Sequence, residues 1–105
     1  MGRATPPFFL VDGLDVGVFA SLRDVELFLE PAYLHETVVY DAKGRLIRPE
    51  SNGNRINASL LEDESEHARE LETALRDFLI AIREPVGGDP TCNLDCLVEA
   101  CRKFI

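Results

Sequence analysis

The sequence has no long hydrophobic run, and no apolar stretch approaches the ~20 residues that a membrane-spanning helix requires. Met1 to Pro7 contains Arg3 but lacks the long apolar region that should follow it in a secretory signal peptide. These absences predict a cytoplasmic protein that does not bind a membrane.

Basic residues are also scarce. Lys and Arg number 11 against 19 Asp and Glu, which gives a formal net charge of −8. Nucleic-acid binding depends on clustered Lys and Arg that displace counterions from phosphates, so we expect no nucleic-acid partner. A basic protein is the natural complement of such a surface. The alternative is that the charge serves only to keep the protein in solution.

Cysteines are few and odd in number: all three lie between Cys92 and Cys101. An odd count cannot form a fully paired disulfide framework, so we expect reduced thiols that pack as small hydrophobic side chains. The spacing differs from the paired C-x2-C of zinc sites. On a helix Cys92 and Cys101 would point in opposite directions, so one metal ion would take at most two thiols, those of Cys92 and Cys96. A redox-sensing thiol is a further alternative.

Catalytic patterns are missing as well. No Ser or Cys lies in a nucleophile elbow, and no glycine-rich phosphate loop precedes a helix. His67 lies among acidic residues, and on a continuous helix Asp63 and Glu70 would share its face. A small enzyme or metal-binding protein that uses His67 with these carboxylates, or the Cys92 and Cys96 thiols, therefore stays an alternative to a solvated helix face. We expect no cofactor.

The patterns that are present predict an α+β fold. Apolar runs around Asp12-Gly13, a β-branched segment at Thr37–Tyr40, a return at Arg45–Arg48 and an alternating segment at Arg55–Leu60 predict five strands. A helix capped by Ser21 and a second helix, whose apolar face runs from Ala68, complete a ββαβββα order. We expect a mainly antiparallel sheet with the helices packed on one face, one parallel pair being possible.

We expect an α+β core domain over residues 1–83, a Pro/Gly linker over 84–90 and a C-terminal helix over 91–105. The linker, with two prolines and two glycines, should fix no strong local geometry. Asp89, followed by Pro90, is the expected cap of the last helix. That helix carries an apolar stripe. Either it folds back on its own sheet or it forms a homodimer, which we favour. The stripe comprises Leu94, Leu97, Val98, Cys101, Phe104 and Ile105.

Acidic residues concentrate around the second helix. Asp63, with Glu66 three residues later, is its expected cap, and Glu66 with Glu70 is a like-charge pair one turn apart. Unrelieved repulsion on one helix favours a cationic partner. Asp63, Glu66, Glu70 and Asp77 are therefore the candidate partner-binding residues of a non-catalytic, protein-binding domain.

Two segments carry a resemblance: Ser21-Leu22-Arg23-Asp24-Val25-Glu26-Leu27-Phe28-Leu29-Glu30-Pro31, and Val39-Tyr40-Asp41-Ala42-Lys43-Gly44-Arg45-Leu46. Through them residues 8–82 resemble small uncharacterised bacterial α+β proteins, some of which are immunity proteins of polymorphic toxin systems. The resemblance implies a non-enzymatic protein, of an immunity or regulatory type, that binds and neutralises a partner. Its motifs are a capped helix and a turn, so it assigns no functional residue.

Overall fold

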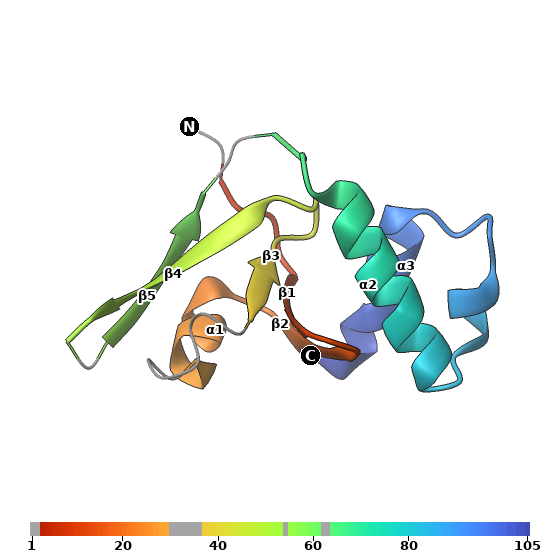
Figure 1. Ribbon diagram of the computed structural model, residues 1–105, viewed down its shortest axis with the longest axis horizontal. Helices are drawn as coiled ribbons and strands as arrows, with labels where there is room; N and C mark the ends of the chain where they lie inside the picture. Colours follow the sequence, from red (N-terminus) through yellow and green to blue (C-terminus); the bar gives the residue numbers. More distant parts are fainter. Residues whose placement is uncertain (1–2, 30–36, 54, 62–63) are drawn as a thin grey trace.

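The computed structural model describes residues 3–29, 37–53, 55–61 and 64–105, and the expected α+β fold with its ββαβββα order is confirmed. The strands and helices are arranged as Figure 1 shows. They are β1 (Phe8–Asp12), β2 (Asp15–Phe19), α1 (Leu22–Phe28), β3 (Val38–Tyr40), β4 (Leu46–Asn52), β5 (Arg55–Leu60), α2 (Ala68–Ala81), the 3-10 helix η2 (Pro85–Gly88), α3 (Leu94–Cys101) and the 3-10 helix η3 (Arg102–Phe104).

The five strands form one sheet in the order β2-β1-β3-β4-β5, and every neighbouring pair is antiparallel. β2 and β3 lie on either side of β1, so they run parallel to each other without being paired. α1 makes the crossover between them. The parallel pair that the crossover allowed is therefore not formed, because β1 occupies the place between the two strands.

Two hairpins build the ends of this sheet. Asp12 and Asp15 close the β1–β2 hairpin around Gly13, whose φ of 62° is a conformation that glycine adopts without steric cost. β4 is longer than the sequence predicted, because it continues through Pro49. Pro49 pairs with Ala58 beyond the part of β4 that pairs with β3, so its missing amide interrupts no hydrogen bond between strands.

α1 begins as predicted. The Ser21 side chain accepts a hydrogen bond from the amide of Asp24 at 3.1 Å. The helix ends at Phe28, and Leu29 is already extended. Pro31, which disfavours a helical conformation in the residue before it and so predicts a helix end near Glu30, lies outside the described residues.

The helices cover both faces of the sheet, so the expectation that they all pack on one face was wrong. Phe8 and Leu10 of β1 pack with Val25 of α1, whereas Phe9 packs with Leu71 of α2 and with the buried side of α3. Alternate residues of a strand point to opposite faces, so the fully apolar β1 has buried side chains on both. Figure 1 shows α1 on one side of the strands and α2 with α3 on the other.

α2 begins at Ala68, and its N-cap residue is His67, which makes no capping bond through its side chain. The predicted cap, Asp63, lies outside the described residues. A tertiary contact is present at the start of the helix: the His67 amide donates to the Gly44 carbonyl at 3.2 Å. A Cβ on Gly44 would lie 2.2 Å from the Ala68 Cα, so this turn packs directly against α2.

The segment expected to be a linker of no fixed geometry is instead ordered. Pro85 to Gly88 form η2, and a Cβ on Gly87 would lie 2.8 Å from the Ile80 amide nitrogen. The prediction was wrong because glycine here permits close packing against α2. The cap of α3 is also different: the side chain of Asn93, and not Asp89, accepts from the Cys96 amide at 3.0 Å.

The apolar stripe of the last helix folds back on its own sheet. Leu97, Val98 and Cys101 are buried in the core shared with α2, and Phe104 and Ile105 are the members of the stripe that stay exposed. The reason we gave for a dimer through this helix, a long unpartnered stripe, therefore does not hold. Among the described residues no helix is long and apolar enough to cross a membrane.

Candidate partner-binding surface

The acidic residues singled out in the sequence do not all lie on one helix. Asp63 is outside the described residues, and Glu66 lies in the turn before α2. Glu70 is in the first turn of α2, and Asp77 follows seven residues later. A seven-residue separation is close to two helical turns, so Glu70 and Asp77 lie on one face about 10 Å apart along the axis. That face is opposite the buried Leu75.

The repulsion argument needs correction. Glu66 precedes the first residue of the helix, so Glu66 and Glu70 are not a helical i, i+4 pair. With Asp63 outside the described residues, Glu66, Glu70 and Asp77 remain of the predicted set, and the exposed Glu64 is added to them; we call these four carboxylates the acidic surface. None of them makes an ion pair with a described Lys or Arg. Glu70 only accepts a hydrogen bond from the Tyr40 hydroxyl, at 3.3 Å.

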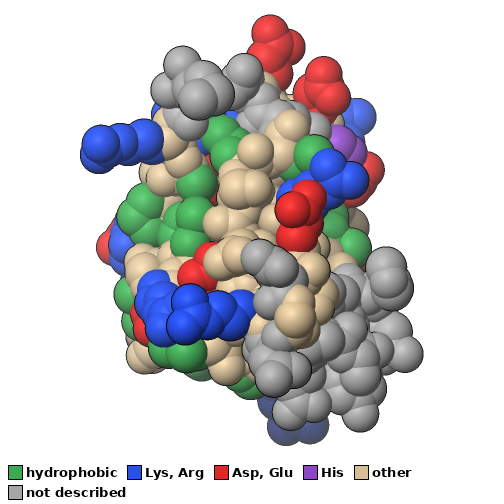
Figure 2. Space-filling model, turned by 90° about the vertical axis from the view of Figure 1, so that its left-hand side faces the viewer, with side chains coloured by type: hydrophobic (Ala, Val, Ile, Leu, Met, Phe, Trp, Pro, Cys, Tyr) green, Lys and Arg blue, Asp and Glu red, His purple; other side chains and the backbone are tan. Residues whose placement is uncertain are grey.

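The far end of the molecule has a different character. Figure 2 views the protein from the side of the β4–β5 hairpin, and there basic and acidic side chains are interspersed around small hydrophobic areas. Arg48 and Glu50, both exposed, form one such mixed pair at 3.5 Å. The acidic surface differs from this end in that none of its four carboxylates pairs with a described Lys or Arg.

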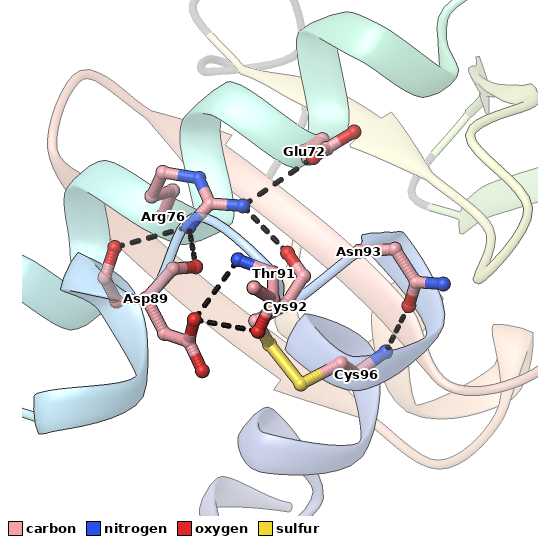
Figure 3. The surroundings of a disulfide bond; sticks show 8 residues. Glu72, Arg76, Asp89, Thr91, Cys92, Asn93 and Cys96 are labelled. Atoms are coloured by element: carbon pink, nitrogen blue, oxygen red, sulfur yellow. Dashed lines mark hydrogen bonds and ion pairs between the residues drawn. A yellow bond between two sulfur atoms is a disulfide. The ribbon is translucent and has the colours of Figure 1, made fainter.

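Arg76 does not neutralise the acidic surface, although it is on α2. Its guanidinium turns toward the following loop and donates to the carbonyls of Gly87, Asp89 and Cys92, the last at 2.6 Å. It also pairs with Glu72 at 3.4 Å. In Figure 3 the same side chain reaches from α2 to the loop before α3. Arg76 thus holds the η2–α3 connection against α2.

The metal-site alternative at His67 has no support from the described residues, which hold no group of three His, Cys, Asp or Glu side chains placed to bind one ion. The helical geometry on which it depended is also missing, because His67 is the cap of α2 and not a residue within it. Glu70 is instead engaged with Tyr40.

The expectation of three reduced thiols was wrong. Cys92 and Cys96 form a disulfide, with their Cα atoms 5.2 Å apart, and Cys101 is free and buried. Cys92 precedes Asn93, the cap of α3, whose backbone is extended, and the disulfide joins Cys92 to Cys96 in the first turn of the helix (Figure 3). Disulfides persist in oxidising compartments. Reduced thiols would have agreed with the expected cytoplasmic location, whereas a disulfide does not.

Two groups near this loop have shifted pKa values. Burial raises the pKa of the Cys101 thiol from 9.0 to about 11, because the thiolate would be desolvated. The pKa of Asp89 is lowered by hydrogen bonds from the Thr91 hydroxyl and amide to its carboxylate. Packing explains the first shift and a local turn explains the second, and neither gives a nucleophile or a general base.

One polar group in the core escaped sequence analysis, which treated Tyr40–Arg45 only as a turn. Asp41 is fully buried and pairs with Arg45, whose Nη2 lies 2.7 Å from Oδ2. Its carboxylate also accepts from the amides of Thr5, Lys43 and Arg45. The sequence pattern that could have indicated this ion pair is an Asp and an Arg four residues apart around the turn at Gly44. Every bond of Asp41 ends within the protein, so the pair is structural.

Comparisons with known proteins add no relative to this picture. No family model matches the chain, and neither the curated proteins nor the solved structures include a match.

Proposed function

We propose that this chain is a non-catalytic protein-binding domain that presents the acidic surface of Glu64, Glu66, Glu70 and Asp77 to a basic partner. The observation that supports the proposal is that these carboxylates are exposed and make no ion pair with a described Lys or Arg. Glu70 and Asp77 are in addition held on one face of a regular helix, at a fixed spacing. A cationic partner would offset the net charge of −8.

A regulatory or immunity-type role is the form of this function that the resemblance to small bacterial proteins, some of them immunity proteins, favours. In that role the partner is a toxin domain with a basic surface, which the acidic surface covers. A toxin gene adjacent to the gene for this chain would support the role, whereas a metabolic operon would favour a small enzyme.

The test is charge reversal on the acidic surface with a matched control. Glu70→Lys with Asp77→Lys changes the net charge by the same amount as Glu50→Lys with Glu99→Lys, two exposed carboxylates elsewhere on the molecule. Each control carboxylate is in an exposed ion pair of small energetic value. Surface changes of this kind cost under about 0.5 kcal/mol of stability each, which urea unfolding verifies.

Wild type, reversed variant and control are then used as bait in the native host. A stoichiometric partner recovered by wild type and control, and lost from the reversed variant, is the expected result. With the purified partner the loss appears mainly as slower association, and it shrinks as salt is added. A reversed variant that binds the partner as tightly as wild type at low salt would refute the proposal.

A further inference from the structure

The two edges of the sheet differ in how they are protected. β2 and β5 are the outer strands, and each presents backbone groups on one side that no neighbouring strand pairs. Unpaired edges are templates for pairing with another chain, so proteins commonly block them. Whether each edge is blocked decides where an additional strand can be accepted.

The β5 edge is blocked by α1. The Glu26 carboxylate accepts a hydrogen bond from the Ala58 amide at 2.7 Å. This amide points away from β4, and an incoming strand would have to replace the carboxylate there. It would also force the Glu26 charge out of its place between α1 and β5, where the side chain is mostly buried. Pairing at this edge is therefore unfavourable.

The β2 edge is open along its centre. Because Asp12 and Asp15 close a two-residue hairpin loop, the pairs that exchange hydrogen bonds with β1 are those of Asp15, Gly17 and Phe19. The backbone groups of Val16 and Val18 consequently point outward. Neither residue makes an outward hydrogen bond to any part of the chain that the structure describes. The outward amides and carbonyls of Val16 and Val18 are thus available to bond an additional strand.

Exposed aromatic and aliphatic side chains flank this edge on both faces of the sheet. On the α1 face, the Phe28 ring packs on Phe19 with centroids 5.2 Å apart, yet Phe28 remains 63% exposed. On the opposite face η3 lies against β2, and Phe104 and Ile105 are 38% and 56% exposed. Figure 1 shows the C-terminus beside the β1–β2 hairpin. Apolar groups on both sides of an unpaired strand are typical of a surface that is covered.

We propose that the β2 edge pairs with the β2 edge of a second copy of this chain, antiparallel and with the two-fold axis at Gly17. In that register Val16 of one copy exchanges both backbone hydrogen bonds with Val18 of the other, and the reverse pair is identical. Gly17 meets Gly17 at the axis, where the strands of a non-hydrogen-bonded pair approach most closely and a residue without Cβ fits.

The occupant is a second copy because the edge is self-complementary in hydrogen bonding and in apolar character. Val16, Val18 and Phe19 carry no charge, and the one charged residue of β2, Asp15, lies at the end of the strand and away from the axis. The blocked β5 edge prevents further growth, so the association closes as a dimer and does not extend into a filament. A strand-edge interface with a few flanking side chains is small, so we expect a dissociation constant on the order of micromolar.

The net charge predicts that dimerisation and binding of a basic partner depend on salt concentration in opposite directions. Two copies that each carry a net charge of −8 repel one another, and salt screens this repulsion. Dimerisation should therefore become tighter as the salt concentration rises, whereas binding of a basic partner should weaken. The two proposals use different surfaces, and each can fail without the other.

The test is sedimentation velocity of the full chain over a concentration series at low and high salt. Val16→Pro removes one outward amide but keeps an apolar side chain, and proline is tolerated at an edge strand. We expect wild type to shift toward a dimer, more so at high salt, and Val16→Pro to stay monomeric with an unchanged far-UV spectrum. If that variant does not fold, Phe104→Ser with Ile105→Ser removes the apolar side chains that flank β2, and this variant should also stay monomeric.

A cross-linking experiment tests the register. Gly17→Cys places two thiols at the axis; its Cβ would lie 2.9 Å from the Phe19 ring, the tip of which must shift, and oxidised glutathione should then link the thiols into a covalent dimer. Ser59→Cys puts an exposed thiol on the blocked β5 edge and should not cross-link. Wild type that stays monomeric at high micromolar concentration in high salt, a Val16→Pro variant that dimerises normally, or equal cross-linking at both positions would each overturn the proposal.

Discussion

Substitution of Asp41, whose carboxylate is buried, should lower the free energy of unfolding more than the other single substitutions considered below. Asp41 has no exposed surface and Arg45 is nearly buried, and Arg45 contacts the carboxylate through Nε at 2.9 Å and through Nη2 at 2.7 Å. Asp41→Ala would leave the guanidinium without its counter-ion, and removal of one partner of a buried ion pair costs about 3–5 kcal/mol. Because domains are stable by only about 5–15 kcal/mol, the variant should be marginally folded.

Two further variants separate charge from hydrogen bonding. Asp41→Asn keeps an acceptor for the amides of Lys43 and Arg45 but removes the charge. Its stability should therefore lie between that of wild type and that of Asp41→Ala. Asp41→Ala with Arg45→Met removes both charges and should recover part of the stability lost by Asp41→Ala alone.

The measurement is urea unfolding followed by far-UV circular dichroism. Glu50→Ala is the matched control, because it breaks the exposed Arg48–Glu50 pair and should cost under about 1 kcal/mol. A loss below about 1 kcal/mol for Asp41→Ala would show that water or a rearranged Arg45 replaces the carboxylate, and the reasoning from burial would fail.

Other predictions follow from single backbone and thiol positions. Arg83 has a φ of 63° at the end of α2, where the Glu84 amide bonds the Leu79 carbonyl, so Arg83→Gly should raise the free energy of unfolding by about 1 kcal/mol in urea titrations. Cys92 and Cys96 are four residues apart, and reduction of their disulfide should lower the free energy of unfolding by about 2 kcal/mol, as urea titrations with and without reductant would measure. Cys101 should resist iodoacetamide at pH 8 until the protein unfolds, as mass spectrometry would show. Because its folded pKa of about 11 lies above its ordinary 9.0, it contributes stability that is fully present below pH 9 and lost between pH 9 and pH 11.

Local patterns predicted the elements well, because their causes lie within a few residues. Ser21 caps α1 through the adjacent Asp24 amide, and the Asp12–Asp15 turn closes a hairpin through Gly13. Strand order was not predictable, since it depends on β1 meeting β3 across the whole of α1. The order of the strands therefore depends on pairing between segments that are distant in the sequence, which local patterns do not reveal.

The errors have a common origin in contacts between distant residues. The start of α2 was misplaced because the contact with Gly44 lies outside the local pattern that a capping box describes. The η2 segment was misjudged because Gly87 packs on α2, a role that composition cannot distinguish from flexibility. The disulfide was missed because a helical path was assumed through Cys92. Of the candidate residues, Glu66, Glu70 and Asp77 are exposed, whereas Asp63 lies outside the described residues and the arrangement of the carboxylates was not predicted.

The place of β1 in the sheet also bears on how the chain reaches its native state. β1–β2 and β4–β5 are hairpins of neighbouring segments and close short loops, whereas Leu10 meets Val39 only after β2 and α1 have been looped out. Closing that longer loop has the larger entropic cost, so the two hairpins should form before the sheet is joined. Amide protons of β1 that bond to β3 should consequently exchange with solvent only through global unfolding, while those at the tip of the β4–β5 hairpin exchange through local opening.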